Sequence, residues 1–207
     1  MRYCAGMDEI AGLRERKKVQ TRTALSRAVM ALALDRGLDA VTADDIAAAA
    51  NVSVRTFHNY FGSKEEALIA FWRRQFGVYV AELRARPADE PILVSLEHIL
   101  AGIAARAADR SSDLATQSDR VWMSSTLARW RPVLIEEATR MATDAVAERT
   151  GTDASTDIYP RLMAATAIAA AVTAFEFAEA SEQDPERFIH ESFALLRAGI
   201  ERSESGP

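Results

Sequence analysis

Four side chains within residues 54–59 have the chemistry that proteins use to recognise DNA bases. If this segment is a helix, the four share one outward stripe: Val54, Arg55, His58 and Asn59. An arginine can pair with guanine through two hydrogen bonds, an asparagine can pair with adenine, and a valine can contact the methyl group of thymine. A short helix with such a face fits the major groove of DNA, so the spacing predicts a surface that reads bases.

Hydroxyl groups and one ammonium group flank this stripe, where side chains and helix N-termini would bind phosphate oxygens. They belong to Thr42, Thr56, Tyr60 and Lys64. Taken one at a time, residues of this region have plainer explanations: Arg55 as a surface charge, His58 as a solvated histidine and Tyr60 as a half-buried core residue. Their arrangement around one short helix is what favours DNA binding.

The sequence before the stripe predicts two helices that would support it. Residues 13–36 have apolar positions at helical spacing, with basic residues between them, and Gly37 is a good helix stop. Thr42 and Asp45 have the spacing of a capping box, in which each side chain binds the backbone N–H of the other residue. We therefore expect a second, short helix that begins after Thr42 and ends near Ala50.

A tight turn should join that helix to the helix that carries the stripe. Asn51 tolerates the left-handed backbone conformation that such a turn needs, and Ser53 can cap a helix over residues 54–61. A second capping box, formed by Ser63 and Glu66, predicts a long helix that follows immediately. Two short helices joined by a tight turn and flanked by longer helices are typical of a helix-turn-helix domain.

The charge of the chain is unevenly distributed. The formal net charge is −5 at pH 7, but residues 10–64 contain nine basic and five acidic residues, which gives them +4 and leaves −9 for the rest. All three lysines fall in that basic segment. An N-terminal anion-binding module on an acidic body is one interpretation, although runs of charge are also common on solvated helix faces.

The composition argues against several other classes of protein. The single cysteine, Cys4, cannot form an internal disulfide, and we expect a reducing, cytoplasmic location. The N-terminal segment lacks the long apolar region of a signal peptide, and the apolar run at residues 162–175 is too short to span a membrane. No Gly-rich phosphate loop, nucleophile motif or metal-binding spacing is present, so we expect no catalytic residue, no cofactor and no metal.

The N-terminal part of the chain resembles the DNA-binding domain of the TetR/AcrR (tetracycline-repressor) family. The resemblance covers residues 14–72 and rests on the first helix, RERKKVQTRTALSRAVMALALDRG, and on TADDIAAAANVSVRTFHNYFGSKEEAL at residues 42–68. The family pattern is a threonine cap, a short Ala-rich helix, V-S-x-x-T-aromatic and Y-F-x-x-K-E-x-L. Asn51 stands where the family commonly has glycine, and His58 stands where it frequently has tyrosine, which leaves one base or phosphate contact open.

This resemblance implies an all-α, homodimeric bacterial transcription regulator, usually a repressor that a small molecule releases from a palindromic operator. It implies that Thr42, Tyr60 and Lys64 contact the DNA backbone and the stripe contacts the bases, with Thr56 in either role. The helical pattern of the sequence predicts about nine helices after a disordered tail at residues 1–12. Together with the resemblance, it divides the rest of the chain into a helix-turn-helix domain (13–64), a connecting helix (65–84) and a ligand-binding and dimerisation domain (85–207).

The C-terminal part is less informative. Helices are expected over residues 91–109, 112–128, 131–150, 156–182 and 185–203. Bulky residues of the middle helices, with one histidine, are candidates for the pocket of a largely apolar ligand, either fatty-acyl or aromatic: Phe76, His98, Trp122, Met123, Trp130, Met141 and Phe175. Bulky residues at helical spacing are also typical of plain core, and a lone histidine is commonly a satisfied core residue.

Small residues in the helix at 156–182 would permit the close approach of another helix, and the resemblance implies that the last two helices pair with those of a second copy. The predicted interface residues are Ala167, Ala170, Ala171, Ala174, Phe193, Leu196 and Ile200. The alternative is that this alanine face packs only inside one subunit.

Two other functions are less favoured by the sequence. An enzyme would need an acid–base or nucleophile set, and the three histidines do not assemble one. A TetR-like helical interaction module without inducible DNA binding would not need the outward stripe or the basic first helix.

Overall fold

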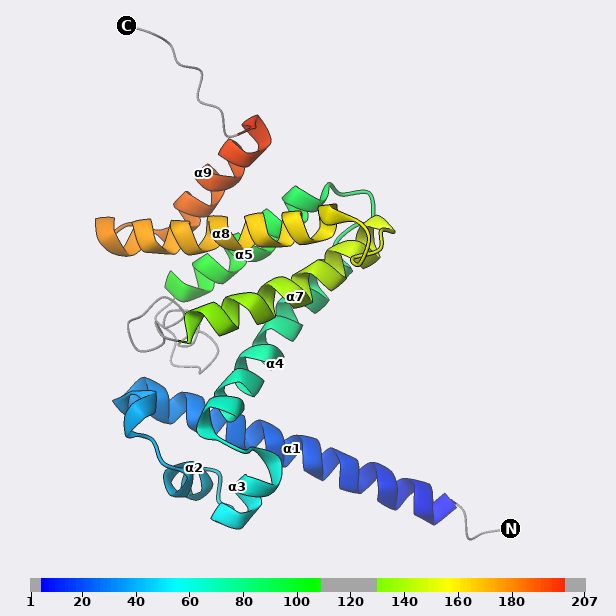
Figure 1. Ribbon diagram of the computed structural model, residues 1–207, viewed down its shortest axis with the longest axis vertical. Coiled ribbons are helices and arrows are strands. Elements are labelled where there is room, and N and C mark those ends of the chain that lie inside the picture. Colours follow the sequence, from blue (N-terminus) through cyan, green and yellow to red (C-terminus); the bar gives the residue numbers. More distant parts are fainter. Residues whose placement is uncertain (1–4, 109–129, 200–207) are drawn as a thin grey trace, which may run out of the picture. The chain divides into compact units, whose positions relative to one another are not determined.

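The computed structural model describes residues 5–108 and 130–199. In chain order the elements are α1 (Ala5–Arg36), the 3-10 helix η1 (Leu38–Ala40), α2 (Ala43–Ala49), α3 (Val54–Tyr60), α4 (Lys64–Ala85), α5 (Ile92–Ala108), α7 (Arg131–Thr150), α8 (Ile158–Ser181) and α9 (Pro185–Ala198) (Figure 1). The described residues contain no strand, so the predicted all-α class is confirmed. The helix expected at 112–128 lies outside the described residues.

The helix limits agree closely with expectation, except at the N-terminus. α1 begins at Ala5, whereas the sequence suggested a disordered tail through residue 12. Once a helix exists, each further residue adds a hydrogen bond without a new nucleation cost, so α1 can extend beyond its packed part. The short η1 adds to the expected elements. It follows Gly37, whose φ of +78° is readily adopted without a side chain.

The chain divides into two compact units, residues 1–72 and 73–207, and the helix expected as a connection is α4, which contributes to both. The first unit consists of α1, η1, α2, α3 and the beginning of α4. Its largest fully buried side chains are Leu25, Val29, Met30, Ile46, Phe57, Phe61, Leu68 and Trp72. Each α-helix of this unit thus contributes at least one large, fully buried side chain.

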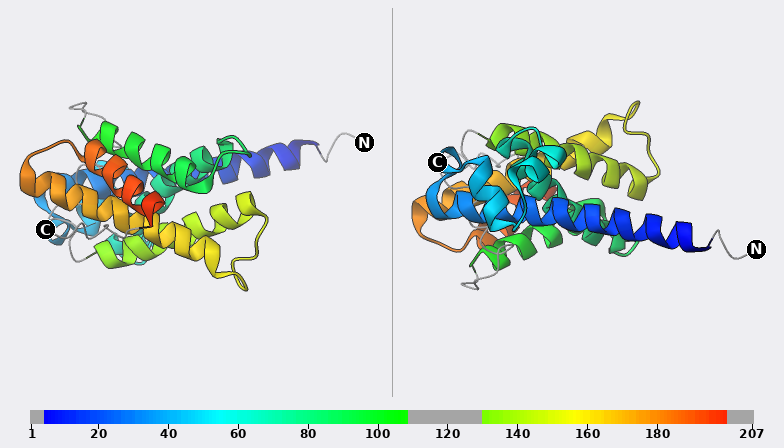
Figure 2. Two further views of the ribbon diagram at one scale, coloured as in Figure 1. Left: turned by 90° about the horizontal axis from the view of Figure 1, so that it is seen from above. Right: turned by 90° about the horizontal axis from the view of Figure 1, so that it is seen from below.

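The second unit packs α5, α7, α8 and α9 around a core that combines alanines with larger residues. α8 contacts α7 and α9, and α5 contacts α8 and α9 (Figure 1, Figure 2). The buried face of α8 consists mainly of small residues: Ala164, Ala167, Ala171, Ala174 and Ala178. Small side chains let the neighbouring helices approach, and bulky residues such as Ile189 and Phe193 of α9 fill the remaining space.

α8 is also largely apolar, with charged residues only near its ends. Among the residues that the structure describes, it is the one helix whose length and mean hydropathy, 1.4 over its most apolar window, would allow it to cross a membrane. Length and composition alone do not distinguish such a segment from a core helix. One face of α8 contacts α5, α7 and α9, and 28% of the apolar window is buried within the chain.

Side chains of α7 bind α4 along the part that belongs to the second unit. Arg73 Nε donates to Glu137 Oε1 at 2.6 Å, and Arg84 donates to Glu148 in two hydrogen bonds of 2.6 and 2.9 Å. Both arginines are about half exposed, and an exposed ion pair contributes about 0–1 kcal/mol. These pairs therefore set the register of the two helices more than they stabilise them.

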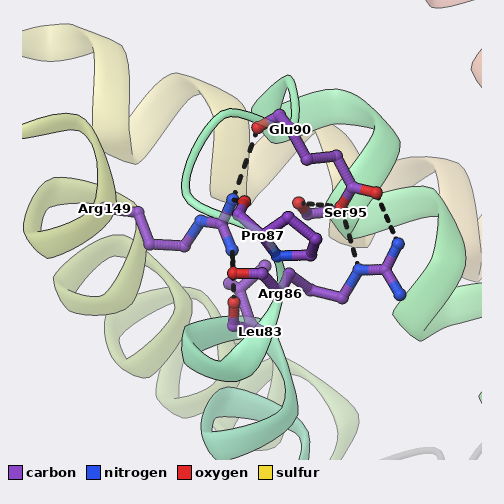
Figure 3. A network of polar contacts seen from close by, with 6 residues as sticks. All are labelled: Leu83, Arg86, Pro87, Glu90, Ser95 and Arg149. Atoms are coloured by element: carbon purple, nitrogen blue, oxygen red, sulfur yellow. Dashed lines mark hydrogen bonds and ion pairs between the residues drawn. The ribbon is translucent and has the colours of Figure 1, made fainter.

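Arg149, in the last turn of α7, binds the end of α4 and the loop that follows (Figure 3). Its guanidinium donates to the carbonyls of Leu83 (2.7 Å), Arg86 (3.1 Å), Pro87 (2.9 Å) and Glu90 (3.3 Å). The last carbonyls of a helix have no partner within the helix, and the five N–H donors of an arginine can satisfy several carbonyls together. The clamp formed by Arg149 therefore fixes where α4 ends.

Glu90 closes the same loop from within. Its carboxylate accepts hydrogen bonds from Arg86, at 2.9 Å for Nε, and from the hydroxyl of the buried Ser95, at 2.5 Å (Figure 3). The hydrogen bonds from Arg86 and Ser95 lower the pKa of Glu90 to about 2. The carboxylate is therefore charged at neutral pH and keeps both bonds.

Replacing Arg149 by alanine is expected to destabilise the protein by about 2–3 kcal/mol, because several carbonyls lose a charged donor at once. Arg149→Lys should recover only part of this loss, since an ammonium has three donors and no planar fork. Urea unfolding measures both variants. Arg140→Ala, which removes an exposed arginine from the same helix, is the control, with an expected loss of at most about 1 kcal/mol. Equal losses for the Arg149 and Arg140 variants would contradict the clamp.

Candidate nucleic-acid interface

α2 and α3 each begin with a side-chain cap, and a tight turn joins them. Thr42 Oγ1 accepts the Asp45 N–H at 3.2 Å and Asp45 accepts the Thr42 N–H at 2.9 Å, which forms the capping box. Asn51 has a φ of +54°, in the left-handed region. Ser53 accepts the Thr56 N–H at 3.1 Å and caps α3. Local side chains thus determine both helix starts and the turn between them.

The capping box of α2 is also bound to α1. Asp45 Oδ2 lies 2.8 Å from a guanidinium nitrogen of Arg36 and accepts the hydroxyl of Thr42 at 2.6 Å. The hydrogen bonds from Thr42 and Arg36 lower the pKa of Asp45 to about 2. The Thr42 hydroxyl, which we expect at a DNA phosphate, donates its proton to Asp45 in this structure.

α3 has one buried face and one exposed face. Phe57 and Phe61 are each 1% exposed, and their ring centroids lie 6.1 Å apart. Arg55, His58 and Asn59 are exposed. The spacing of four residues between the two phenylalanines places them on the same side of the helix and leaves the other side to solvent. The structure thus brings three of the four stripe residues together on one accessible surface.

The remaining predicted contact residues of α3 lie at the edges of this surface. Val54, Thr56 and Tyr60 are half-buried. The hydroxyls of Thr56 and Ser53 share a hydrogen bond of 2.8 Å. The roles of these residues toward DNA stay predictions.

Arg22 has a contact that the sequence does not reveal. In the sequence it is one charge of a basic helix, but in the structure it donates to the carbonyl of Tyr60 at 3.1 Å. Its guanidinium carbon also lies 4.4 Å from the ring centroid of Phe61, which is a cation–π contact. Because Arg22 and Tyr60 are 38 residues apart, no local pattern could have indicated the pair.

Lys64 also binds within the chain. Its ammonium donates to the carbonyls of Leu38 (2.9 Å), Asp39 (3.1 Å) and Val41 (2.9 Å). The residue that we predicted at a phosphate therefore has its donors directed at η1 and the residue that follows η1. A phosphate contact would require these bonds to break.

The exposed positive charge of the first unit includes a basic run on α1. Arg14, Lys17, Lys18 and Arg27 are exposed there, and Arg55 is exposed on α3. Exposed cations attract DNA phosphates whatever the base sequence, with a strong dependence on salt.

The predicted pocket residues of the second unit occupy different environments. Phe76 is buried, and Met141 and Phe175 pack against the core of this unit. Trp130 is half-buried at the start of α7, whereas His98 is exposed on α5, so His98 does not place a polar group inside the core. Outside the described residues lie Trp122 and Met123. Among the described residues, no group of three or more His, Cys, Asp or Glu side chains could hold a metal ion.

The predicted dimer interface needs correction on α8 and α9. Four of its residues are buried inside the core of one chain: Ala167, Ala171, Ala174 and Phe193. Ala170 and Leu196 are partly buried beside the same core, and Ile200 lies outside the described residues. The alanine spacing does form a helix face, but its small side chains pack against helices of the same chain. For the buried residues this agrees with the alternative that the sequence left open, and the position of the dimer interface stays a prediction.

Two family models match the chain. One, described as bacterial regulatory proteins of the tetR family, matches residues 25–71, and the other, described as the MftR C-terminal domain, matches residues 133–201. Among curated proteins, the HTH-type transcriptional regulator TcmR of Streptomyces glaucescens is 30% identical over 161 residues, which cover 74% of this chain and 71% of TcmR.

Solved structures have the same fold. FadR of Thermus thermophilus, a TetR-family transcriptional repressor in complex with lauroyl-CoA, is 26% identical with a TM-score of 0.58, and the match covers 90% of this chain and 98% of FadR. A TetR-family transcriptional regulator of Streptomyces coelicolor is 22% identical with a TM-score of 0.59, over 87% of this chain and 97% of that chain.

Proposed function

The chain belongs to the TetR family of bacterial regulatory proteins and is a transcriptional regulator, and from this premise we propose that it is a ligand-released repressor. A homodimer would bind a palindromic DNA site, with its two α3 helices in successive major grooves about 34–36 Å apart. A small, largely apolar ligand would favour a dimer arrangement that no longer fits the site. The observation that carries the proposal is the face of α3, where Arg55, His58 and Asn59 are exposed opposite a buried phenylalanine pair.

Each residue of this face suits a different part of the DNA. The guanidinium of Arg55 matches the two acceptors of guanine, and the amide of Asn59 can pair with adenine. Val54 offers methyl groups to thymine, and His58 can bind a base edge or a phosphate. The hydroxyls that would contact the DNA backbone are those of Thr42, Thr56 and Tyr60.

Arg55→Ala is expected to reduce discrimination between the natural site and a scrambled duplex by about 1–3 kcal/mol, since one bidentate base contact is lost. Fluorescence anisotropy measures the affinity of each variant for two duplexes, one from upstream of the protein's own gene, taken as the natural site, and one with the same bases scrambled. Arg27→Ala, which removes another exposed cation of the same unit, is the matched control and should weaken both duplexes to a similar extent. If the wild-type protein retains neither duplex at low salt, the DNA-binding proposal fails and an interaction module without DNA binding is favoured.

We place the dimer interface on the exposed sides of α8 and α9. Ile158, Leu162 and Phe177 of α8 are 78%, 51% and 61% exposed, and Leu195 of α9 is 39% exposed. With 3.6 residues per turn, Ile158 and Leu162 lie opposite the buried alanines of α8. Phe177 lies on the flank of the helix, where its ring centroid is 6.1 Å from that of Phe188 of α9. Large apolar side chains that gather on one surface indicate a contact with another protein. A second copy of the chain would therefore cover the face that the first copy leaves exposed.

Phe177→Glu and Leu162→Glu are each expected to convert a dimer into a monomer, because a carboxylate would be buried without a partner in the interface. Size-exclusion chromatography with light scattering measures the molar mass. Val19→Glu, which adds a carboxylate at an apolar position of α1 that is 52% exposed, should leave the dimer intact. Dimers in both α8 variants would show that the interface lies elsewhere, and a monomeric wild-type protein would contradict the proposed homodimer.

The ligand would bind among the helices of the second unit. Phe76 is buried, and Met141 and Phe175 pack against the core of this unit. Gly77 faces Met141, since a Cβ added at Gly77 would lie 3.9 Å from the terminal methyl of that methionine. One candidate class of ligand is a fatty-acyl compound, since FadR of Thermus thermophilus was solved with lauroyl-CoA. The other candidate class, a flat aromatic compound, comes from the aromatic residues among the predicted pocket residues.

Native mass spectrometry of the purified protein should reveal a co-purified ligand as a mass above that of the chain.

If the ligand is fatty-acyl, lauroyl-CoA should raise the thermal unfolding midpoint, because a molecule that binds the native state stabilises it. It should also release the protein from the upstream duplex. A planar aromatic compound with these effects, and lauroyl-CoA without them, would favour the aromatic class. Compounds of both classes that bind without any change in DNA affinity would contradict a ligand-released repressor.

A further inference from the structure

We propose that Glu97 of α5 is a positioning residue for dimerisation: it fixes the rotation of α9 about its axis, and thereby the direction of the apolar face that a second copy would cover. This inference rests on the proposed homodimer and deepens it, because it gives a role in dimerisation to a residue that acts through another helix. The contacts that carry it join α5 to α9, which pack against each other within the second unit (Figure 2).

The carboxylate of Glu97 binds two basic side chains of α9, one at each oxygen. Nη1 of Arg197 donates to Oε2, and Nδ1 of His190 lies 2.8 Å from Oε1. An ionised carboxylate only accepts hydrogen bonds, so Nδ1 of His190 carries the proton in this pair. The partners lie 93 and 100 residues from Glu97 in the chain, and no local pattern indicates these contacts. We call the two hydrogen bonds the α5–α9 tie.

The acceptor of this tie is a mostly buried charge. The side chain of Glu97 is 14% exposed, whereas those of His190 and Arg197 are 54% and 43% exposed. Burial raises the pKa of the Glu97 carboxyl, but the hydrogen bonds from Arg197 and His190 together lower it by more, so this pKa lies below its usual range. The carboxylate is therefore charged at neutral pH. A buried charge that loses its partners is strongly unfavourable, so Glu97 favours the arrangement in which α9 keeps both side chains beside it.

The two donors lie on one flank of α9. With 3.6 residues per turn, positions 190 and 197 are almost two turns apart and project in nearly the same direction, about 10 Å from each other along the axis. Ile189 and Phe193, both 0% exposed, point into the core beside this flank. Apolar packing is non-directional and tolerates a small rotation of the helix. Hydrogen bonds weaken steeply as their angle departs from linear, so the tie does not tolerate it.

The opposite side of α9 is the one that we place in the dimer interface. Leu195 comes two residues before Arg197, so on a helix it projects about 160° away from that arginine, and it is 39% exposed. A rotation of α9 would turn Leu195 relative to the exposed apolar residues of α8, such as Leu162. Glu97, which is largely buried, therefore acts on the interface through α9.

Loss of the tie should weaken dimerisation even though the interface residues are unchanged. Only a monomer whose α9 has the correct rotation can associate, and the apparent affinity falls with the fraction of such monomers. If each copy keeps that rotation about a third of the time, the dissociation constant of the dimer rises roughly tenfold, because the fraction enters once for each of the two copies.

Glu97→Ala, His190→Ala and Arg197→Ala test the proposal. Fluorescence-detected sedimentation over a dilution series gives the dissociation constant of the dimer, which should rise in all three variants and about tenfold in Glu97→Ala. Because His190 and Arg197 are about half exposed, their variants keep the test decisive if Glu97→Ala does not fold. A tie that only stabilised the fold would lower the midpoint of urea unfolding and leave the dissociation constant of the folded protein unchanged, which would overturn the proposal.

Glu148→Ala is the matched control. It removes another carboxylate that joins two helices of the same unit, since Glu148 of α7 accepts two hydrogen bonds from Arg84 of α4. Its dissociation constant should stay within about twofold of the wild-type value. A rise as large as that of Glu97→Ala would show that any lost ion pair of this unit weakens the dimer, and the specific role of Glu97 would be overturned.

A double-mutant cycle distinguishes positioning from direct contact with the second copy. If Arg197 acts through Glu97, the double variant Glu97→Ala/Arg197→Ala should weaken the dimer no more than Glu97→Ala alone, because contacting residues are not additive. Arg197→Lys, which retains a charged donor, should recover part of the affinity that Arg197→Ala loses. Fully additive effects would place Arg197 in the interface itself and overturn the tie as the cause.

Failure of the proposed homodimer is distinguishable from failure of this inference. A wild-type protein that is monomeric at every concentration contradicts the homodimer and leaves no interface for Glu97 to position, so both proposals fail. A wild-type dimer whose dissociation constant is the same in Glu97→Ala overturns this inference alone.

Discussion

A helix of seven residues is too short to hold its shape alone in water, and this constraint governs the first unit. Isolated helices shorter than about 12–15 residues are marginal because nucleation is unfavourable. α3 therefore depends on the cap at Ser53 and on the burial of Phe57 and Phe61. Burial of two phenylalanine side chains contributes about 3–6 kcal/mol, more than the exposed ion pairs of the surface can add.

Because the buried side of α3 stabilises the helix, the side chains of its exposed face are not needed to hold it in place. Arg55, His58 and Asn59 can present their donors and acceptors to solvent without weakening the core. Charged side chains donate to backbone carbonyls at η1 and at the end of α3: Lys64 binds Leu38, Asp39 and Val41, and Arg22 binds Tyr60. Arg149 does the same for the end of α4 in the second unit, where it binds four carbonyls. In both units, cations that look like surface charge in the sequence complete the hydrogen bonding of helix ends.

The sequence predicted the features that arise from neighbours in the chain. The capping box at Thr42, the left-handed turn at Asn51 and the cap at Ser53 each act over at most four residues, and all three occur in the structure. The partners of Lys64 and Arg22 lie 23 to 38 residues away, so the sequence showed their charge but not its use. In the same way, the spacing of alanines in α8 identified a helix face but not which chain would cover it. Periodicity defines a face, and only the tertiary structure defines its partner.

A structure of the protein bound to a duplex from upstream of its own gene tests most directly whether the exposed face of α3 reads bases. We predict that the side chains of Arg55 and Asn59 lie at base edges in the major groove, while Phe57 and Phe61 stay buried as they are in this structure. Contact with the duplex through another surface, or an α3 whose exposed face points away from the bases, would contradict this mechanism.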